Sequence, residues 1–159
     1  RVKVRAKVKE NAVLLDTYDV KNGETPEIIA HKYYGDSQYH WVVLLVNDIT
    51  DRYHEWPMSF VQFEDYINDK YSNVDGTHHY KIAQTSGDTS KYIEVYDPSL
   101  LTDAGASSDS DAYGSATEVT NMEYEQELQD TRRKIKLLDP RFLDTFVTEY
   151  QTLMQESVL

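Results

Sequence analysis

Residues 18–49 of the chain read YDVKNGETPEIIAHKYYGDSQYHWVVLLVNDI, and this stretch decides the fold. It begins at the end of residues 13–20, which suggest a short strand that follows an alternating basic and apolar run at residues 1–9. Residues 22–23 are Asn-Gly, a pair that tolerates positive φ and therefore predicts a turn. Residues 25–26 are Thr-Pro, which predicts a helix start because Thr caps the first turn and Pro suits its first position. Gly35 is expected to end that helix.

The second half of the stretch predicts another helix, which Asp36 or Ser37 can cap. Its body, residues 39–46, is apolar on nearly every side, so we expect it to be buried near the centre of the domain. Leu44 and Leu45 are the expected anchors of that core.

Two further patterns follow this stretch. Ser59 and Gln62 form a capping-box pattern that opens a third helix, with an apolar stripe that runs to Tyr71. From about residue 79 the period changes to two, and two strand-like runs flank a polar tip at residues 85–90, which predicts a β-hairpin.

The C-terminal part combines a loop with helices. Residues 97–117 are rich in Ser, Asp, Ala and Gly, a composition that favours a flexible linker. Thr120 and Glu123 form a second capping box before a charged helix that is expected to end near Arg133. Residues 135–138 fit either a continuation of that helix or a short strand. Residues 139–140, Asp-Pro, then predict a last helix.

The sequence therefore predicts an α+β fold with a small β-α-α core, an added helix, a β-hairpin and a C-terminal helical arm. The expected ranges are a basic N-terminal arm or strand at 1–15, a core domain with the third helix at 16–72, a hairpin at 73–100, a flexible acidic linker at 101–117 and a C-terminal helical arm at 118–159.

Composition excludes several functions. The 159 residues carry a net charge of −12, although residues 1–10 hold five basic groups and one acid. The acidic excess argues against non-specific binding to nucleic acid or anionic membrane. The basic arm fits either an acidic partner or a protected edge strand. There is no Cys, which excludes disulfides and thiolate chemistry, and no apolar run is long enough for a membrane span. Because the sequence does not begin with Met, we expect residues before Arg1.

No pattern of residues indicates catalysis, a cofactor or a metal. Asp109 and Asp111 are spaced like the opening of a calcium loop, but Thr120 stands where such a loop needs Glu. Adjacent residues in a strand face opposite sides, so His78 and His79 are expected to be surface or interface histidines rather than joint metal ligands.

Thirteen Tyr residues favour a protein with large contact faces. The aromatic residues near the core fit a sugar-stacking groove, but core and interface packing is favoured because Trp41 lies in the most apolar helix. This set consists of Tyr33, Tyr34, Tyr39, Trp41, Tyr53 and Trp56.

Residues 18–49 resemble a LysM module through the Gly-Glu-Thr turn and the Leu-Leu-Val-Asn-Asp-Ile segment at 44–49. Glu24 replaces the usual Asp of that turn, and the Pro-x-Gly and closing strand of a sugar-binding LysM are not evident after Ile49. The wider pattern, including Trp56-Pro57 and the Arg-Arg-Lys-Ile-Lys-Leu-Leu segment at 132–138, is similar to the LysM-like baseplate wedge protein of T-even-like phages, baseplate wedge protein fifty-three.

This resemblance implies a non-enzymatic structural subunit of a contractile tail baseplate, assembled in the host cytoplasm and present in several copies in the virion. Its implied partners are other baseplate wedge subunits, with no nucleic acid, membrane, small-molecule substrate or cofactor. The alternative is a LysM-type peptidoglycan-binding module that targets a lytic complex to the cell wall. The residues that carry the LysM-like core are Tyr18, Gly23, Thr25, Ile29, Tyr34, Gly35, Trp41, Leu44, Leu45, Asn47 and Trp56.

The last helix carries an apolar stripe, which must pack against other apolar side chains to be shielded from water. Because a single helix of this length is marginal in water, we expect the stripe to dock on a partner subunit rather than on its own domain. The predicted interface residues are Phe142, Phe146, Val147, Tyr150, Leu153 and Met154.

Overall fold

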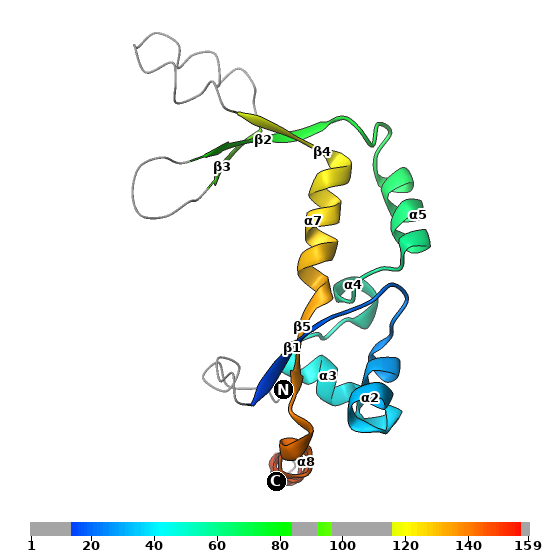
Figure 1. Cartoon of the computed structure of the whole chain (residues 1–159), viewed down its shortest axis with the longest axis vertical. Helices are drawn as coiled ribbons and strands as arrows, with labels where there is room; N and C mark the ends of the chain where they lie inside the picture. The colour runs from blue at the N-terminus through cyan, green and yellow to red at the C-terminus, as the bar shows by residue number, and fades with distance from the viewer. Residues whose placement is uncertain (1–13, 84–91, 97–115, 157–159) are drawn as a thin grey trace. The chain divides into compact units, whose positions relative to one another are not determined.

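The computed structural model describes residues 14–83, 92–96 and 116–156, and its helices and small antiparallel sheets confirm the α+β class (Figure 1). These residues form two compact units, each considered by itself. Unit 1 contains residues up to Gln62 and from Gln129 onward, and unit 2 contains Phe63–Leu128. The predicted ranges 16–72 and 118–159 are each divided between the two units. The predicted arm at 1–15 and linker at 101–117 lie largely outside the described residues.

Unit 1 is built around strand β1, which pairs with strand β5 in an antiparallel ladder from Leu15↔Leu138 to Asp19↔Lys134. Figure 1 shows the two strands side by side, with helices α2 and α3 next to them. The partner strand of β1 thus comes from the C-terminal part of the chain. The elements of unit 1 are β1 (Leu15–Asp19), α2 (Pro26–Tyr34), the 3-10 turn Ser37–Tyr39, α3 (His40–Val46), α4 (Arg52–Glu55), β5 (Lys134–Leu138), the 3-10 turn Pro140–Phe142 and α8 (Leu143–Glu156).

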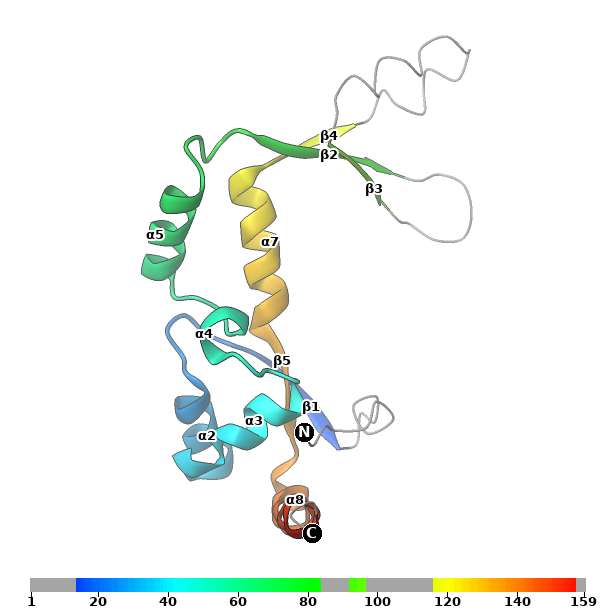
Figure 2. The same ribbon diagram turned by 180° about the vertical axis from the view of Figure 1, so that it is seen from behind.

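Unit 2 contains a three-stranded antiparallel sheet in the order β3-β2-β4 (Figure 2). The predicted hairpin is confirmed as β2 and β3, while β4 was not expected and pairs with the other edge of β2. The strands are β2 (Thr77–Ala83), β3 (Tyr92–Val95) and β4 (Thr117–Thr120). Helices α5 (Phe60–Lys70) and α7 (Asn121–Arg133) each begin in one unit and end in the other.

The predicted helix starts are confirmed because each depends on local hydrogen bonds. The Thr25 side chain accepts a hydrogen bond from the Ile28 amide, and Gly35 ends α2 with φ 82°. The Ser59 side chain accepts a hydrogen bond from the Gln62 amide at 3.4 Å. Thr120 and Glu123 cap α7 in the same reciprocal way. Local chemistry thus fixes where these helices begin.

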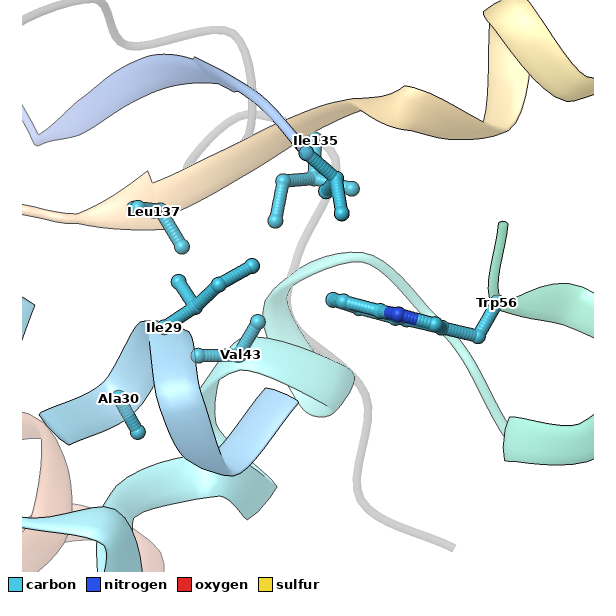
Figure 3. Close-up of a cluster of buried hydrophobic side chains, with 7 residues drawn as sticks. Ile29, Ala30, Val43, Trp56, Ile135 and Leu137 are labelled. Carbon is cyan, nitrogen blue, oxygen red and sulfur yellow. The ribbon is translucent and has the colours of Figure 1, made fainter. Parts of the chain in front are cut away.

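The core of unit 1 lies between α2, α3 and the β1–β5 sheet. Figure 3 shows Ile29 of α2, Val43 of α3, and Ile135 and Leu137 of β5 turned toward one another, with the Trp56 ring at one side. Ala30 of α2 belongs to the same buried cluster. Burial of these apolar side chains is the main force that joins the N-terminal and C-terminal parts of the chain.

The prediction for α3 is correct in part. The helix is buried, but its deepest side chains are Val42, Val43 and Val46, each 2% exposed or less. Leu44 and Leu45, the predicted anchors, are only half-buried. Because nearly every position of this helix is apolar, the pattern does not reveal which side faces the core.

Candidate functional site

The turn between β1 and α2 is built around a buried carboxylate. Glu24 is 8% exposed and accepts hydrogen bonds from the Tyr18 hydroxyl at 2.9 Å, the Lys21 amide at 2.9 Å and the Lys32 Nζ at 2.5 Å. The Trp56 ring nitrogen donates to the backbone oxygen of Glu24 at 2.8 Å. Gly23 precedes it with φ 75°. The turn is therefore held to both helix α2 and the Trp56 segment.

The ionisation of this turn follows from the same contacts. Burial by itself raises the pKa of Glu24, but the hydrogen bonds from Lys32, the Lys21 amide and Tyr18 outweigh burial and lower that pKa below its ordinary value. Burial, followed by the hydrogen bond to Glu24, raises the pKa of Tyr18 to about 12. At neutral pH, Glu24 is thus a carboxylate that serves as a structural acceptor.

Asn47 joins the end of α3 to strand β5. Its amide nitrogen donates to the backbone oxygens of Val43 and Lys136, and its side-chain oxygen accepts from the Lys136 amide, each at 2.8 Å. These two contacts with Lys136 imitate one step of a β-ladder. A polar side chain at the end of α3 therefore fixes the C-terminal strand in place.

The C-terminal helix α8 packs against the ring of Trp41, a contact that we call its aromatic seat. The Trp41 ring lies 6.3 Å from the Phe146 ring and 4.7 Å from the Tyr150 ring, measured between centroids. Phe142 and Val147 also pack against the core cluster that contains Val42. Within this single chain, the first turns of the predicted interface stripe thus contact the chain's own core.

The stripe continues beyond this seat. Leu153 is 43% exposed and Met154 is 42% exposed, near the end of α8. Large apolar side chains that remain in water after the rest of a stripe is covered are suited to contact with another molecule.

The remaining predicted core residues are distributed through unit 1. Ile29 is 1% exposed, and Tyr34 packs edge-on against Tyr33 and Tyr39 with centroids 5.2 and 6.2 Å apart. The six aromatic residues do not make one exposed groove, because Trp56 is 8% exposed whereas Tyr53 is 87% exposed. The interpretation as core packing is confirmed for Trp56.

In unit 2, a buried carboxylate joins helix α7 to the end of α5. Glu125 is 2% exposed and accepts hydrogen bonds from the Lys70 Nζ at 2.6 Å and the Tyr71 hydroxyl at 2.9 Å. Burial opposes ionisation, but the hydrogen bonds from Lys70 and Tyr71 lower the pKa of Glu125 overall. A buried carboxylate without these donors would be strongly disfavoured.

The expectation for the two adjacent histidines is wrong for His79, which is 1% exposed. A register shift between Thr77 and His79 interrupts the alternation of strand β2, so the two rings meet instead of facing opposite sides. Their Nδ1 atoms are 2.8 Å apart, and the His78 ring stacks on Tyr124 at 3.9 Å. Sequence spacing alone gave no sign of this bulge.

The described residues contain no group of three or more His, Cys, Asp or Glu side chains that could hold a metal ion. Asp109 and Asp111, considered as a calcium loop, lie outside the described residues. A search of the described helices also found none with the length and apolar character needed to cross a membrane.

These features define a class of protein: a small α+β chain whose buried polar groups join its own segments and which keeps some large apolar side chains, such as Leu153, exposed. The chain belongs to the family described as base plate wedge protein 53, which matches residues 6–153. It is 27% identical over 147 residues to the baseplate wedge protein gp53 of Enterobacteria phage T4, and the match covers 90% of this chain and 75% of that protein. The chain is therefore a structural component of a phage tail baseplate, located in the virion.

Proposed function

We propose that this chain joins neighbouring wedge subunits during baseplate assembly, and that the exposed end of α8 is one of its contact surfaces. The observation that carries the proposal is the apolar stripe of α8, which extends past its seat on Trp41 to the exposed side chains of Leu153 and Met154. A helix that is anchored at one end and apolar at the other fits a groove on a partner.

The LysM-like character of unit 1 is part of this proposal. The order β1-α2-α3 with β5 as an antiparallel partner of β1 supports a β-α-α-β arrangement. In a LysM-like frame of this kind, the N-terminal and C-terminal parts of the chain stabilise each other. Such a frame suits a role in which the domain presents a helix rather than binds a sugar.

Assembly of wedges from purified proteins tests the contact surface. Leu153→Asp together with Met154→Asp should leave the thermal midpoint of the isolated chain almost unchanged, because both positions are exposed. Incorporation into wedges, measured by sedimentation, should fall at least about tenfold, since burying a Leu or Met side chain contributes about 1.5–3 kcal/mol.

The matched control is Thr145→Asp together with Thr152→Asp, which adds the same charge to the polar side of α8. Normal incorporation of the Leu153 and Met154 variant would contradict the proposal. Equal loss in the control would assign the effect to charge rather than to apolar contact. Phe146→Asp with Tyr150→Asp should lower the thermal midpoint as well, because these rings contact Trp41.

A further inference from the structure

A cavity of about 450 Å³ opens in unit 1, where the end of α3, helix α4 and the junction of α7 with β5 meet. Its walls include Asn47, Asp48, Glu55, Arg132 and Lys134. This size is within the range of ligand pockets in proteins. The polar side chains of the walls determine what the cavity can bind.

Two cations in these walls, Arg132 and Lys134, form no ion pair with the residues that the structure describes. In a chain with 28 acidic and 16 basic residues, most described cations form ion pairs, as Lys32 does with Glu24 and Lys70 with Glu125. Arg133, between the two cavity cations, pairs with Asp130 and lies over the Phe60 ring. Over residues 14–83, 92–96 and 116–156, neither Arg132 nor Lys134 forms an ion pair.

Glu55, one of the acids in the cavity wall, already accepts hydrogen bonds from the backbone. The Glu55 carboxylate accepts hydrogen bonds from the amides of Thr50 at 2.6 Å and Asp51 at 3.0 Å, and these contacts lower its pKa. It is thus directed toward the 50–51 backbone. The other acid of the walls, Asp48, also has a partner. Arg132 and Lys134 are therefore the charged wall residues that a ligand with carboxylates can contact.

The cavity walls are held in place before any ligand arrives. Asp48 ends α3 with φ 58°, its amide donates to the Leu45 oxygen at 3.2 Å, and the Ile49 amide donates to the Leu44 oxygen at 2.9 Å. This is the pattern of a Schellman motif. Together with the bonds from Asn47 to Lys136, it fixes one wall against β5, and a fixed wall reduces the entropy lost on binding.

Arg132 could also stand at its position for a reason other than ligand binding. It lies in the last turn of α7, where the helix dipole favours a cation. That effect does not extend to Lys134, which belongs to β5 and is exposed. The cavity walls contain no aromatic ring, so they lack the surface on which a sugar would stack.

We propose that this cavity binds an acidic peptide segment of a neighbouring baseplate protein, with Arg132 and Lys134 receiving its carboxylates. The inference rests on the proposed function, because it names the chemistry of a partner. Charge complementarity carries it: both acids of the walls, Asp48 and Glu55, already have partners, whereas Arg132 and Lys134 form no ion pair among the described residues of this acidic chain.

The test uses the full chain and a fluorescein-labelled hexaglutamate peptide, with binding followed by fluorescence anisotropy at low ionic strength. Arg132→Ala and Lys134→Ala should each weaken binding about tenfold, as expected for loss of a charge-assisted contact. Lys21→Ala removes an exposed cation outside the cavity and should change binding less than about twofold. A hexaglutamine peptide should not compete.

Equal binding by all three variants would overturn the proposal, as would failure of hexaglutamate to bind the unaltered chain. Displacement by millimolar sulfate at constant ionic strength would reveal a general anion site and would also overturn it. The Leu153 and Met154 variant should bind hexaglutamate normally. If that variant fails to join wedges while hexaglutamate never binds, the proposed function stands and only this inference falls.

Discussion

Replacement of Asn47 by Ala should destabilise unit 1 by about 1–3 kcal/mol. The variant loses the hydrogen bonds of 2.8 Å with the oxygen and the amide of Lys136, and each is expected to contribute about 0.5–1.5 kcal/mol. It also loses the bond to the Val43 oxygen, which lies within the same helix end. Water can replace part of these contacts because Lys136 is exposed, so the loss should not exceed this range.

Asn47→Asp is the sharper variant. It keeps an acceptor for the Lys136 amide but places a negative charge against the backbone oxygens of Val43 and Lys136, to which the amide nitrogen donates in the parent chain. We therefore expect Asn47→Asp to be less stable than Asn47→Ala at neutral pH. Protonation of the new carboxyl restores one donor, so acidification should reduce the difference.

Urea unfolding followed by tryptophan fluorescence measures both variants, since the chain's two Trp residues, Trp41 and Trp56, lie in unit 1. The unfolding midpoint should fall while the slope with urea stays constant. The Lys136 amide should also exchange its hydrogen faster. A loss below about 0.5 kcal/mol for Asn47→Ala, typical of a surface position, would refute the role of Asn47 as a clamp.

Three further variants test the packing and the buried charges. Leu137→Ala should cost about 2–5 kcal/mol and more than Leu45→Ala, since Leu137 is 0% exposed and Leu45 is half-buried; equal losses in urea unfolding would contradict this. Asp48→Gly should raise the free energy of urea unfolding by about 0.5–1 kcal/mol, because Gly adopts positive φ without strain; a lower free energy of unfolding would show that the Asp48 side chain stabilises the turn. The lowered pKa of Glu125 contributes stability that is present above its ordinary value of 4.5 and is lost as pH falls through the folded-state pKa. Glu125→Gln should flatten that part of the stability curve, measured by circular dichroism between pH 3 and 7; an unchanged curve would exclude a role for Glu125.

Local signals explain what the sequence predicted correctly. Thr25, Ser59 and Thr120 each cap a helix through contacts three residues away, so their effect does not depend on the rest of the fold. The hairpin of β2 and β3 is local in the same sense. These elements could be placed from spacing and turn chemistry alone.

Contacts between distant segments explain what the sequence did not reveal. Residues 135–138 fitted a helix or a strand equally well, and pairing with β1 decided the outcome. Strand β4 depends in the same way on β2. The burial of His79 required a bulge, which has no signature in the pattern of side chains. Among candidate site residues, Arg132 and Lys134 were part of the family resemblance, but that neither forms an ion pair among the described residues is visible only in three dimensions.

The long path of the chain gives unit 1 a particular dependence on its C-terminal part. Residues 63–128 lie between the two parts of unit 1 in sequence, and Asn47 must reach Lys136 across a separation of 89 residues. The Met58 amide also donates to the buried Gln129 side chain at 3.0 Å, close to where the chain leaves unit 1 and returns to it. Closing such a loop costs entropy before its contacts form. The frame of unit 1 therefore cannot be complete until β5 has been synthesised. Because α8 follows β5 after a 3-10 turn, the contact surface that we propose at the end of α8 forms only on a chain whose β5 strand is also present.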